Sequence, residues 1–290
     1  MMDILQLIAN GVPAGVMYSL VALGIVLIHN GTNVVHFGYG DQVTLAAYIV
    51  VIAQTLFGAP LWLAITAGIV LSALIGLAIY LGLLAPIRRT PLLVQVIATL
   101  AIGTGIREGL RGFMGPDPWP FPSLVTQQIF MIGDVFITSA NVAAVVVAVV
   151  IASLLFLFFR FSKYGQAMLA ACENPKGASI VGISVTSVFA AIWIVASVLA
   201  SVAAIMMAPV LTLSPDMGHI AIKGFCAAIL GGFSSLPGAI VGGVLLGLIE
   251  TAAGYYISTA AKDVVAYAVL IAVVMLMPHG LLGKRKLKKV

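Results

Sequence analysis

Long stretches without a charged side chain dominate the pattern of this chain. Residues 42–87 contain no Asp, Glu, Lys or Arg over 46 positions, and Gly58-Ala59-Pro60 interrupts them. A helix that crosses the hydrocarbon core of a bilayer, roughly 30 Å thick, needs about 20 apolar residues. The stretch is therefore long enough for two crossings joined by a turn at the Gly-Ala-Pro sequence. Similar charge-free stretches lie at 4–40, 135–159, 177–215, 224–249 and 264–283.

These stretches predict an all-α membrane protein, a polytopic helical bundle of about eight or nine transmembrane segments. Of the residues, 62% are hydrophobic and 8% charged, whereas soluble domains are roughly a quarter charged. The segment 218–233 is short for a full crossing and contains Lys223, which favours a broken or half-crossing element. We expect one transmembrane domain over residues 1–290, with helices near 7–28, 41–57, 61–85, 92–113, 137–159, 187–210, 218–233, 236–257 and 263–281.

Basic residues gather in three clusters at the ends of the expected helices. The pair 88–89, the region 160–176 and the tail 284–290 together hold ten of the 14 Lys and Arg residues. Because Lys and Arg are enriched in cytoplasmic loops, the three clusters are expected to share the cytoplasmic side. The N-terminus is then outside, the C-terminus is cytoplasmic, and the proline-rich region 114–136 is a long external loop.

Motifs of enzymes and of ATP-binding proteins are missing from the sequence. It contains no G-x-x-x-x-G-K-[ST], no H-E-x-x-H, no G-x-S-x-G and no paired-cysteine metal motif. We therefore expect no enzymatic activity, no metal and no cofactor in this chain; if ATP drives the protein, a partner hydrolyses it. The net charge of +5 comes from basic residues at helix ends, which argues against a nucleic-acid partner.

The loop 160–186 has the composition of a soluble segment between two plain spans. Residues 166–173 favour a short helix that ends at Asn174, because a residue before proline is pushed out of the helical region. A second short helix is expected from Pro175 up to Gly182. Such a compact pair of helices on the membrane surface has the shape needed to sit in a groove of a motor subunit.

Small and polar residues recur in this loop at a fixed spacing: Gly165, Ala167, Ala170, Glu173, Asn174, Ala178, Gly182 and Ile183. The spacing resembles G-x-A-x-R-A-x-x-E-[DN], then A, then G-I, the cytoplasmic coupling loop of the branched-chain amino acid permease family of ABC importers. Leu169 stands where that family usually has an arginine. The resemblance implies that the loop, together with Pro175, couples this chain to an ATPase.

Three further stretches resemble the same family. Residues 36–41 are similar to its N-F-A-H-G-E sequence before the second helix, with His36 and Tyr39 in place of the usual residues. Residues 230–239 are similar to its glycine-rich turn. Residues 277–283 resemble its ending R-P-x-G-L-[FL]-G, with a methionine in place of the arginine. These four stretches lie in the right order and at the right helix boundaries, and they extend the resemblance over nearly the whole chain.

The resemblance implies a heteromeric importer in the bacterial inner membrane. This chain is then its permease, and it works with a second permease, similar or identical. Two ATP-binding subunits hold ATP and magnesium, and an external solute-binding protein delivers the solute. Branched-chain amino acids are the usual solutes of the family, and similar permeases are associated with urea, amides and organic acids.

Ionisable side chains inside apolar stretches are candidates for a solute pathway, because each costs roughly 2.5–3.5 kcal/mol to insert. Lys223 and Glu250 lie within expected helices and supply both signs of charge for a zwitterion. The alternative is that these two residues pair with each other and only hold the bundle together. The candidate pathway residues are Asp41, Gln42, Asp216, His219, Lys223 and Glu250.

A second group of charges lies toward the outer end of the expected helix 92–113. It consists of Arg107, Glu108 and Arg111, in which Glu108 and Arg111 are i,i+3 neighbours. The group is either a structural ion pair or an outer gate that touches the solute or a docked binding protein.

Two local patterns concern how helices meet. Ser214-Pro215-Asp216 opens the short segment 218–233 much as residues 38–41 open the second helix, which indicates an internal repeat of the kind that transporters use. The glycine pairs 238/242 and 243/247 allow two helices to approach closely. These glycines pack either within the chain or against a second permease.

Two other functions fit an apolar helical bundle. A secondary transporter driven by an ion gradient would use Asp41 and Glu250 as coupling sites, but it has no need of the loop 160–186. A passive channel or a membrane scaffold has no need of that loop either. Co-purification with an ATPase distinguishes both from an ABC permease.

Overall fold

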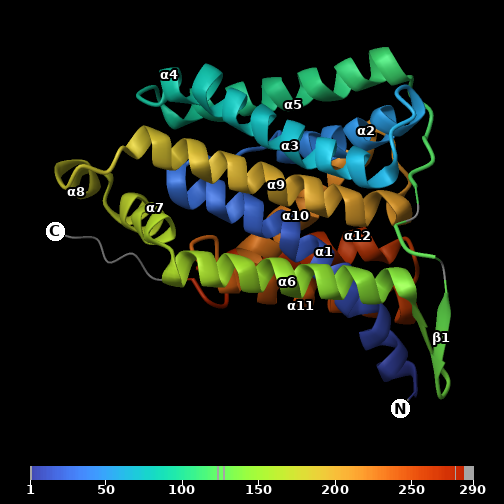
Figure 1. Cartoon of the computed structure of the whole chain (residues 1–290). Coiled ribbons are helices and arrows are strands. Elements are labelled where there is room, and N and C mark those ends of the chain that lie inside the picture. The colour runs from blue at the N-terminus through green and yellow to red at the C-terminus, as the bar shows by residue number, and fades with distance from the viewer. Residues whose placement is uncertain (1, 123, 127, 278, 284–290) are drawn as a thin grey trace. The chain divides into compact units, whose positions relative to one another are not determined.

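The computed structural model describes residues 2–122, 124–126, 128–277 and 279–283, and most of them are helical (Figure 1). The tail 284–290 and Pro278, which carry two of the expectations above, lie outside the described residues. The elements in chain order are α1 (Met2–Thr32), α2 (Tyr39–Thr55), α3 (Leu61–Ile79), the π-helix η1 (Tyr80–Leu84), α4 (Ala85–Ile87), α5 (Leu92–Met114), β1 (Ile129–Ile132), β2 (Val135–Thr138), α6 (Ser139–Phe161), α7 (Lys163–Glu173), α8 (Pro175–Ile180), α9 (Val185–Leu211), the 3-10 helix η2 (Pro215–His219), α10 (Ile220–Gly231), α11 (Leu236–Tyr256) and α12 (Ala261–Leu276).

Six helices in the described chain are long and apolar enough to cross a membrane, and each agrees with an expected segment to within a few residues. The helices α2, α10 and α12 are shorter, with 17, 12 and 16 residues. At about 1.5 Å per residue, α10 extends roughly 18 Å, which is less than the thickness of the hydrocarbon core. The structure is thus that of a multi-pass membrane protein, while the count of eight or nine crossings stays a prediction.

A β-hairpin, which overlaps the end of the region 114–136, corrects the expectation that the fold is all-α. Strands β1 and β2 pair in antiparallel fashion. Gly133 forms the turn between them with a φ of 66°, a conformation that glycine adopts without strain. The side-chain amide of Gln6 donates to the carbonyl of Phe136 and accepts from its N–H, at 2.9 and 2.8 Å. The hairpin is therefore fastened to the start of α1.

The chain divides into two compact units. The first unit comprises Met1–Val26, Ser123–Val149 and Ile222–Val290. The second unit comprises Leu27–Pro122 and Val150–Ala221.

Small residues bring α2, α3 and α9 together in the second unit (Figure 1). A Cβ added to Gly68 of α3 would lie 2.7 Å from a methyl group of Val50 in α2. One added to Gly76 would lie 1.8 Å from the hydroxyl of Ser197 in α9. The Ser72 hydroxyl also donates to the Ser197 carbonyl at 2.9 Å. The three helices thus pack with their backbones close together, as small residues allow in membranes.

The first turn of α2 lies beside the middle of α9. The Tyr39 hydroxyl donates to the carbonyl of Ala196 at 2.7 Å, and Nε2 of Gln42 donates to Oγ of Ser197 at 2.6 Å. Ser197 is the thirteenth of the 27 residues of α9. The helix α2 therefore begins at about half the depth of the second unit, and not at one end of it.

The segment 33–38, between α1 and α2, is not helical. Asn33 follows the last residue of α1 with a φ of 55°, and its N–H donates to the carbonyl of His29 at 2.8 Å. Asparagine tolerates this left-handed conformation, which commonly ends a helix. The ring of His36 then packs on Trp193 of α9, with 4.9 Å between ring centroids. In transporters, an interruption of this kind lines sites inside the membrane.

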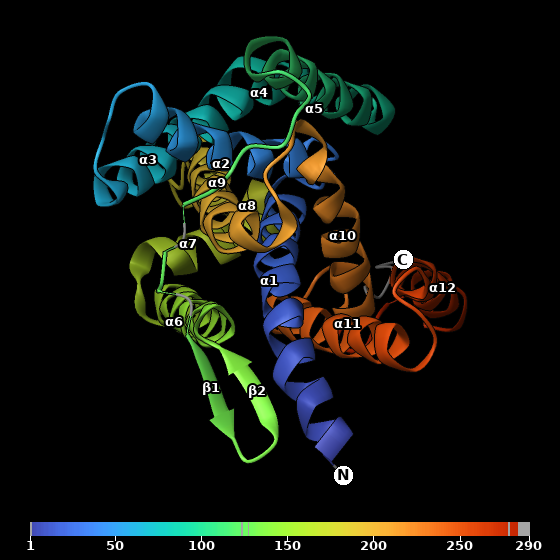
Figure 2. The same ribbon diagram turned by 90° about the vertical axis from the view of Figure 1, so that its right-hand side faces the viewer.

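Glycines also determine the packing of α1, α10 and α11 in the first unit (Figure 2). A Cβ added to Gly247 of α11 would lie 2.3 Å from the backbone nitrogen of Gly15 in α1. One added to Gly242 would lie 2.1 Å from the carbonyl oxygen of Ala227 in α10. The two glycine pairs of α11 therefore pack within the chain.

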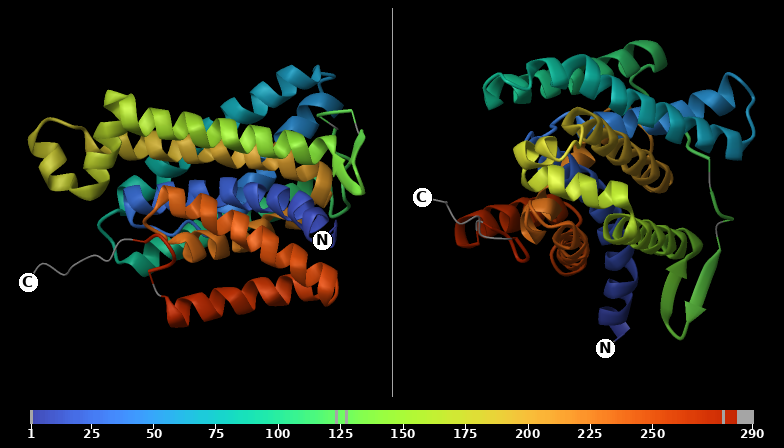
Figure 3. Two further views of the ribbon diagram at one scale, coloured as in Figure 1. Left: turned by 90° about the horizontal axis from the view of Figure 1, so that it is seen from below. Right: turned by 60° about the vertical axis from the view of Figure 1, so that its left-hand side comes forward.

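Two of the family-like stretches meet in the first unit. After α12, the N–H of Leu281 donates to the carbonyl of Leu230, and the N–H of Leu282 donates to that of Gly231, each at 2.9 Å. Helix α12 lies beside α11 (Figure 3). The end of α10, the start of α11 and the segment after α12 thus lie at one end of this unit.

Candidate functional site

Asp41, in the first turn of α2, forms a bidentate ion pair with Arg107 of α5. Its Oδ1 accepts from Nε at 2.9 Å and its Oδ2 accepts from Nη2 at 3.2 Å. The Asp41 side chain is 5% exposed and that of Arg107 is 34% exposed. The carboxylate also faces the positive end of the helix dipole of α2. The Arg107 guanidinium and the start of α2 therefore fix the position of the buried Asp41 carboxylate.

Glycines enclose this carboxylate. A Cβ added to Gly103 of α5 would lie 2.5 Å from Oδ2 of Asp41, and one added to Gly218 of η2 would lie 2.8 Å from Oδ1. A Cβ on Gly40 would lie 2.0 Å from the carbonyl oxygen of Gly218. The backbones of α2, α5 and η2 therefore meet at Asp41. The sequence analysis found that residues 38–41 and 214–216 open their helices in a similar way. The segments that contain them are in direct contact here, through Gly40 and Gly218.

Arg111, one turn after Arg107 on α5, holds two further carboxylates. Its Nη1 donates to Oε1 of Glu108 and its Nη2 donates to Oδ1 of Asp216, both at 2.9 Å. The ring of His219 contacts the carbonyl of Asp216. The side chains of Glu108 and Asp216 are about half exposed, at 54% and 52%. We call Asp41, Arg107, Glu108, Arg111, Asp216 and His219 the arginine cluster.

The arginine cluster unites residues that the sequence analysis divided between a pathway and an outer gate. That assignment to two groups was wrong because α2 begins at about half the depth of the second unit. Asp41 therefore lies beside Arg107, about four turns from the start of α5. Within the cluster the three ion pairs differ in burial. The Arg107–Asp41 pair is enclosed at the carboxylate, whereas the two pairs of Arg111 are with half-exposed carboxylates.

Gln42 lies apart from the ion pairs of the arginine cluster. Its side chain is buried among α2, α3 and α9, where it donates to Ser197 as described above. Trp193 Nε1 and Ser201 Oγ are also buried in this region, and neither has a hydrogen-bond partner in the described part of the chain. The structure therefore places Gln42 in a polar layer inside the second unit.

Lys223 of α10 pairs with two carboxylates in the first unit. Its Nζ donates to Oε1 of Glu250 at 2.7 Å and to Oδ1 of Asp263 at 2.9 Å. It also lies 5.5 Å from the ring centroid of Tyr18. The pairing that the sequence analysis held as the alternative for Lys223 and Glu250 is thus present. Asp263 was missed, because an acid in the first turn of a helix is common and gives no separate signal.

No group of three His, Cys, Asp or Glu side chains is arranged for a metal ion among the residues that the structure describes.

Helices α7 and α8 are the two short helices that were expected in the loop 160–186. A Cβ on Gly165 would lie 2.2 Å from the carbonyl oxygen of Phe158, so glycine lets α7 turn back against α6. Asn174 ends α7 and caps α8, since its Oδ1 accepts a backbone N–H of α8 at 3.0 Å. Gly182 follows α8 with a φ of 85°. The loop is therefore a defined helix pair.

One face of this helix pair is buried and the other presents apolar side chains to solvent. Met168, Ala171 and Ala178 are buried, and both helices contact α9. Among the exposed residues of this loop, Ala170, Glu173, Asn174 and Gly182 were expected to take part in coupling, whereas Tyr164, Ile180 and Val181 were not. Ile180 and Val181 are 85% and 74% exposed. The signal available in the sequence was this pair of adjacent β-branched apolar residues in a loop expected to lie outside the membrane.

Residues 7–274 match the protein family described as "Branched-chain amino acid transport system / permease component". This chain belongs to that permease family. It is therefore a permease component of an ABC transport system and a multi-pass inner-membrane protein, and such components are not themselves enzymes.

The sequences of three named relatives align with nearly the full length of this permease. The high-affinity branched-chain amino acid transport system permease protein LivH of Escherichia coli is 31% identical over 99% of this chain and 97% of its own length. BraD of Pseudomonas aeruginosa, a protein of the same description, is 29% identical over 99% of this chain and 98% of its own. A probable LivH of Methanocaldococcus jannaschii is 30% identical over 93% and 90%.

The family-like stretches of the permease occupy the junctions of its structure. Residues 36–41 form the interrupted start of α2, and residues 165–183 form the α7–α8 pair. Residues 230–239 form the turn between α10 and α11, against which the described part of 277–283 is hydrogen-bonded. The resemblance therefore follows the parts of the fold where backbones meet or turn.

Proposed function

We propose that this permease forms the membrane pathway of an ATP-driven importer for a small polar solute, with branched-chain or related amino acids as the solute class. The α7–α8 pair is the observation that carries the proposal. The pair packs on α9 and exposes the apolar residues Ile180 and Val181 at its end. An exposed apolar contact of this kind is what an ATPase subunit needs in order to bind the permease and transmit its movement. The descriptions of the relatives support the solute class.

An importer of this kind needs partners that supply what the permease lacks. The sequence has no ATP-binding motif, so two ATP-binding subunits hold ATP and magnesium. A second permease, similar or identical, completes the pathway, and an external solute-binding protein delivers the solute. Purification of the tagged permease from its own membranes should bring down an ATPase. Uptake by a preparation that lacks any ATPase would instead favour the ion-driven or passive alternative.

Coupling should depend on the apolar end of the α7–α8 pair. Ile180→Asp places a charge in the contact with the ATPase, and we expect the affinity of the complex to fall on the order of ten-fold or more, with a matching loss of uptake. Gly182→Val should have a similar effect, because a β-branched residue is strained at a φ of 85°. Binding of the purified ATPase and solute-stimulated hydrolysis are measured side by side.

Two matched variants make this test specific. Gly182→Asn should be tolerated, since asparagine accepts a positive φ. Glu173→Lys changes only an exposed charge of the same helix pair, and it reports whether the contact is electrostatic or apolar. Normal binding and hydrolysis in both Ile180→Asp and Gly182→Val would show that another part of the permease contacts the motor.

The proposed topology has nine crossings, with the N-terminus outside and the C-terminus in the cytoplasm. Two crossings are interrupted. In one, residues 33–38 precede α2, and in the other, the five residues of η2 precede the 12 of α10. At about 2.0 and 1.5 Å per residue, η2 and α10 together extend roughly 28 Å, which is close to the thickness of the hydrocarbon core.

Thiol labelling tests this topology. A cysteine in place of Asp117, in the 114–136 region, should react with a membrane-impermeant maleimide added from outside, and one in place of Lys163 should not. Native Cys172 contributes little background, because burial and the nearby Glu173 charge raise the pKa of its thiol to about 11. Near pH 7 this thiol stays protonated and unreactive, and its labelling in opened vesicles should increase as the pH rises. Labelling of Lys163→Cys from outside would reverse the orientation.

The solute route proposed here passes the partly exposed residues of the arginine cluster, which are Glu108, Arg111 and Asp216. Arg111 can bind the carboxylate of an amino acid, and the carboxylates of Glu108 and Asp216 can bind its ammonium group. The cluster holds three carboxylates and two guanidinium groups, and the net negative formal charge of these five side chains favours a cationic group. Gln42, in the polar layer of the second unit, stays a candidate for this route. Lys223 and Glu250 stay candidates as well, because their paired charges lie within the apolar helices of the first unit. Exchange of Arg111 should weaken uptake without unfolding the chain.

A further inference from the structure

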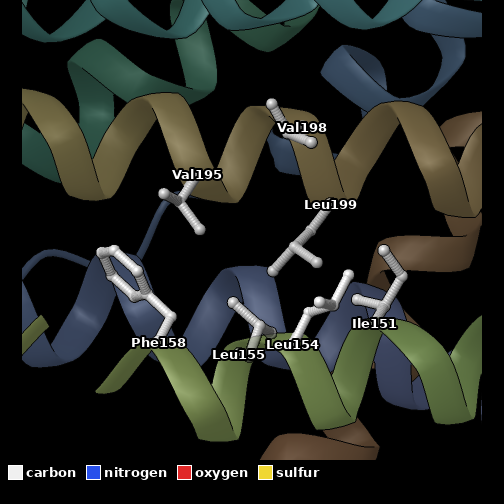
Figure 4. Close-up of a pocket in the computed structure, with 7 residues that line it drawn as sticks. All are labelled: Ile151, Leu154, Leu155, Phe158, Val195, Val198 and Leu199. Carbon is white, nitrogen blue, oxygen red and sulfur yellow. The ribbon is translucent and has the colours of Figure 1, made fainter. Parts of the chain in front are cut away.

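An apolar groove and an interrupted backbone segment are two exposed features of the second unit, and they differ in polarity. The groove, with a volume of about 190 Å³, lies between α6 and α9 (Figure 4). All the residues that line it are aliphatic or aromatic. It therefore offers no hydrogen-bonding side chain to a polar solute. The segment 33–38, between α1 and α2, is different.

This segment lies at a depth inside the membrane. Just before it, a Cβ added to Gly31 would lie 2.6 Å from Cδ1 of Ile192 in α9. Just after it, the Tyr39 hydroxyl meets the carbonyl of Ala196. These two residues of α9 lie roughly 10 and 16 Å along a helix that is roughly 40 Å long. Since α9 is long and apolar enough to cross a membrane, the segment lies within the hydrocarbon core, which is roughly 30 Å thick.

Several backbone groups of the segment have no partner in the protein. The N–H of Phe37 donates to Oγ1 of Thr99 at 3.4 Å. Among the described residues, the N–H groups of Val34, Val35 and His36 form no hydrogen bond. An unpaired N–H is costly in hydrocarbon, so non-helical backbone at this depth occurs only where it is buried in protein or lines water.

Burial within the chain accounts for only part of the segment. The side chains of Val34 and His36 are buried, but Phe37 is 44% exposed, and Asn33 is exposed as well. An exposed asparagine beside unpaired backbone groups is unsuited to lipid, whereas water satisfies both. The segment therefore needs water on the side that carries Asn33 and Phe37.

We propose that this side of the segment 33–38 lines the solute route inside the membrane. The inference rests on the proposed function and adds an intramembrane stretch to the route at the arginine cluster, whose Asp41 follows Phe37 by four residues. An amino acid with an apolar side chain suits such a wall. The ring of Phe37 offers it an apolar contact, while Asn33 and the backbone offer hydrogen bonds to its polar groups.

Thiol accessibility tests the proposal on the full chain in opened membranes, on a background without the two native cysteines. Phe37→Cys should react with a small charged methanethiosulfonate at least about ten-fold faster than Leu74→Cys, because the reactive thiolate forms only where water is present. Leucine, as a probe with a branched apolar side chain, should slow the reaction of Phe37→Cys. Val35→Cys, in the same segment, is a second reporter if Phe37→Cys does not fold.

Leu74 is the matched control, because it is exposed at a similar depth on a complete helix. Its side chain is 54% exposed on α3. It lies between Ser72 and Gly76, which both meet Ser197 of α9. A cysteine there faces lipid and has no unpaired backbone beside it.

Three results would overturn the proposal. Phe37→Cys that reacts as slowly as Leu74→Cys would show that the segment faces lipid. Disulfide cross-linking between two copies of Phe37→Cys would show that a second permease covers it. Fast labelling that leucine leaves unchanged would remove Phe37 from the route. Labelling needs neither ATP nor a partner, so the absence of any ATPase, which would contradict the proposed function, leaves these results distinct.

Discussion

The thermal midpoint of the Gly40→Ala variant is expected to fall by roughly 5–10 °C, or the variant fails to accumulate. A Cβ at this position would lie 2.0 Å from the carbonyl oxygen of Gly218 and 2.7 Å from the Cβ of Ala221. The first contact is with backbone, so no side-chain rotation relieves it. Overpacking of this kind costs about 1–3 kcal/mol or more. Thermal unfolding of the purified chain, followed by size-exclusion chromatography, measures the loss.

Gly109→Ala is the matched control for this prediction. Gly109 lies on α5 in the same unit, and no atom is within 4 Å of a Cβ built there. Because alanine favours a helix over glycine by up to about 1 kcal/mol, this variant should equal or exceed the wild type in stability. If Gly40→Ala were as stable as Gly109→Ala, the contact between the starts of α2 and η2 would not be required for the fold.

Removal of the Arg107 guanidinium should also destabilise the permease strongly. Arg107→Met would leave the carboxylate of Asp41, which is 5% exposed, without its ion-pair partner. Breaking a buried pair from one side costs about 3–5 kcal/mol, and we expect the lower part of this range because the arginine is partly exposed. Asp41→Asn should cost less, since the guanidinium that remains can reach water. The double variant should recover part of the loss, which a double-mutant cycle measures.

Arg111→Gln separates stability from transport within the same cluster. The ion pairs of Arg111 are with half-exposed carboxylates, and such pairs contribute about 0–1 kcal/mol. The variant should therefore unfold like the wild type. If the solute carboxylate meets Arg111, uptake should need a higher solute concentration in the assembled transporter. Unchanged uptake in Arg111→Gln, with normal assembly, would remove the arginine cluster from the route.

Helix positions could be predicted from the sequence because charges are rare enough here to mark the helix ends. The charge-free stretch 42–87, for example, contains α3 and all of α2 after its first three residues, with the turn at 58–60 between them. The β-hairpin was hidden because its two strands are short, and because the second strand overlaps the start of the helix expected at 137–159. Periodicity has little power over four-residue strands.

The depth of an element was beyond the reach of the sequence pattern. Nothing in residues 36–41 shows that the helix they open begins beside the middle of α9, because apolar residues flank it on both sides. The candidate residues were therefore identified singly, and their grouping came from the structure. Asp41 was assigned to a pathway and Arg107 to a gate, although their side chains are 2.9 Å apart. The exposure of Ile180 and Val181 was likewise outside the pattern, because apolar residues in a short helix are more often buried than exposed.

The interrupted start of α2 has a consequence for synthesis of the chain. The hydrogen bond between Gln42 and Ser197 joins residues 155 positions apart, and that between Tyr39 and Ala196 spans 157. At about 5–20 residues per second, a ribosome needs roughly 8–30 s to add so many residues. Throughout that interval the polar groups at the start of α2 are without their partners on α9. The start of α2, although it is synthesised long before α9, is thus completed only after α9 has been made.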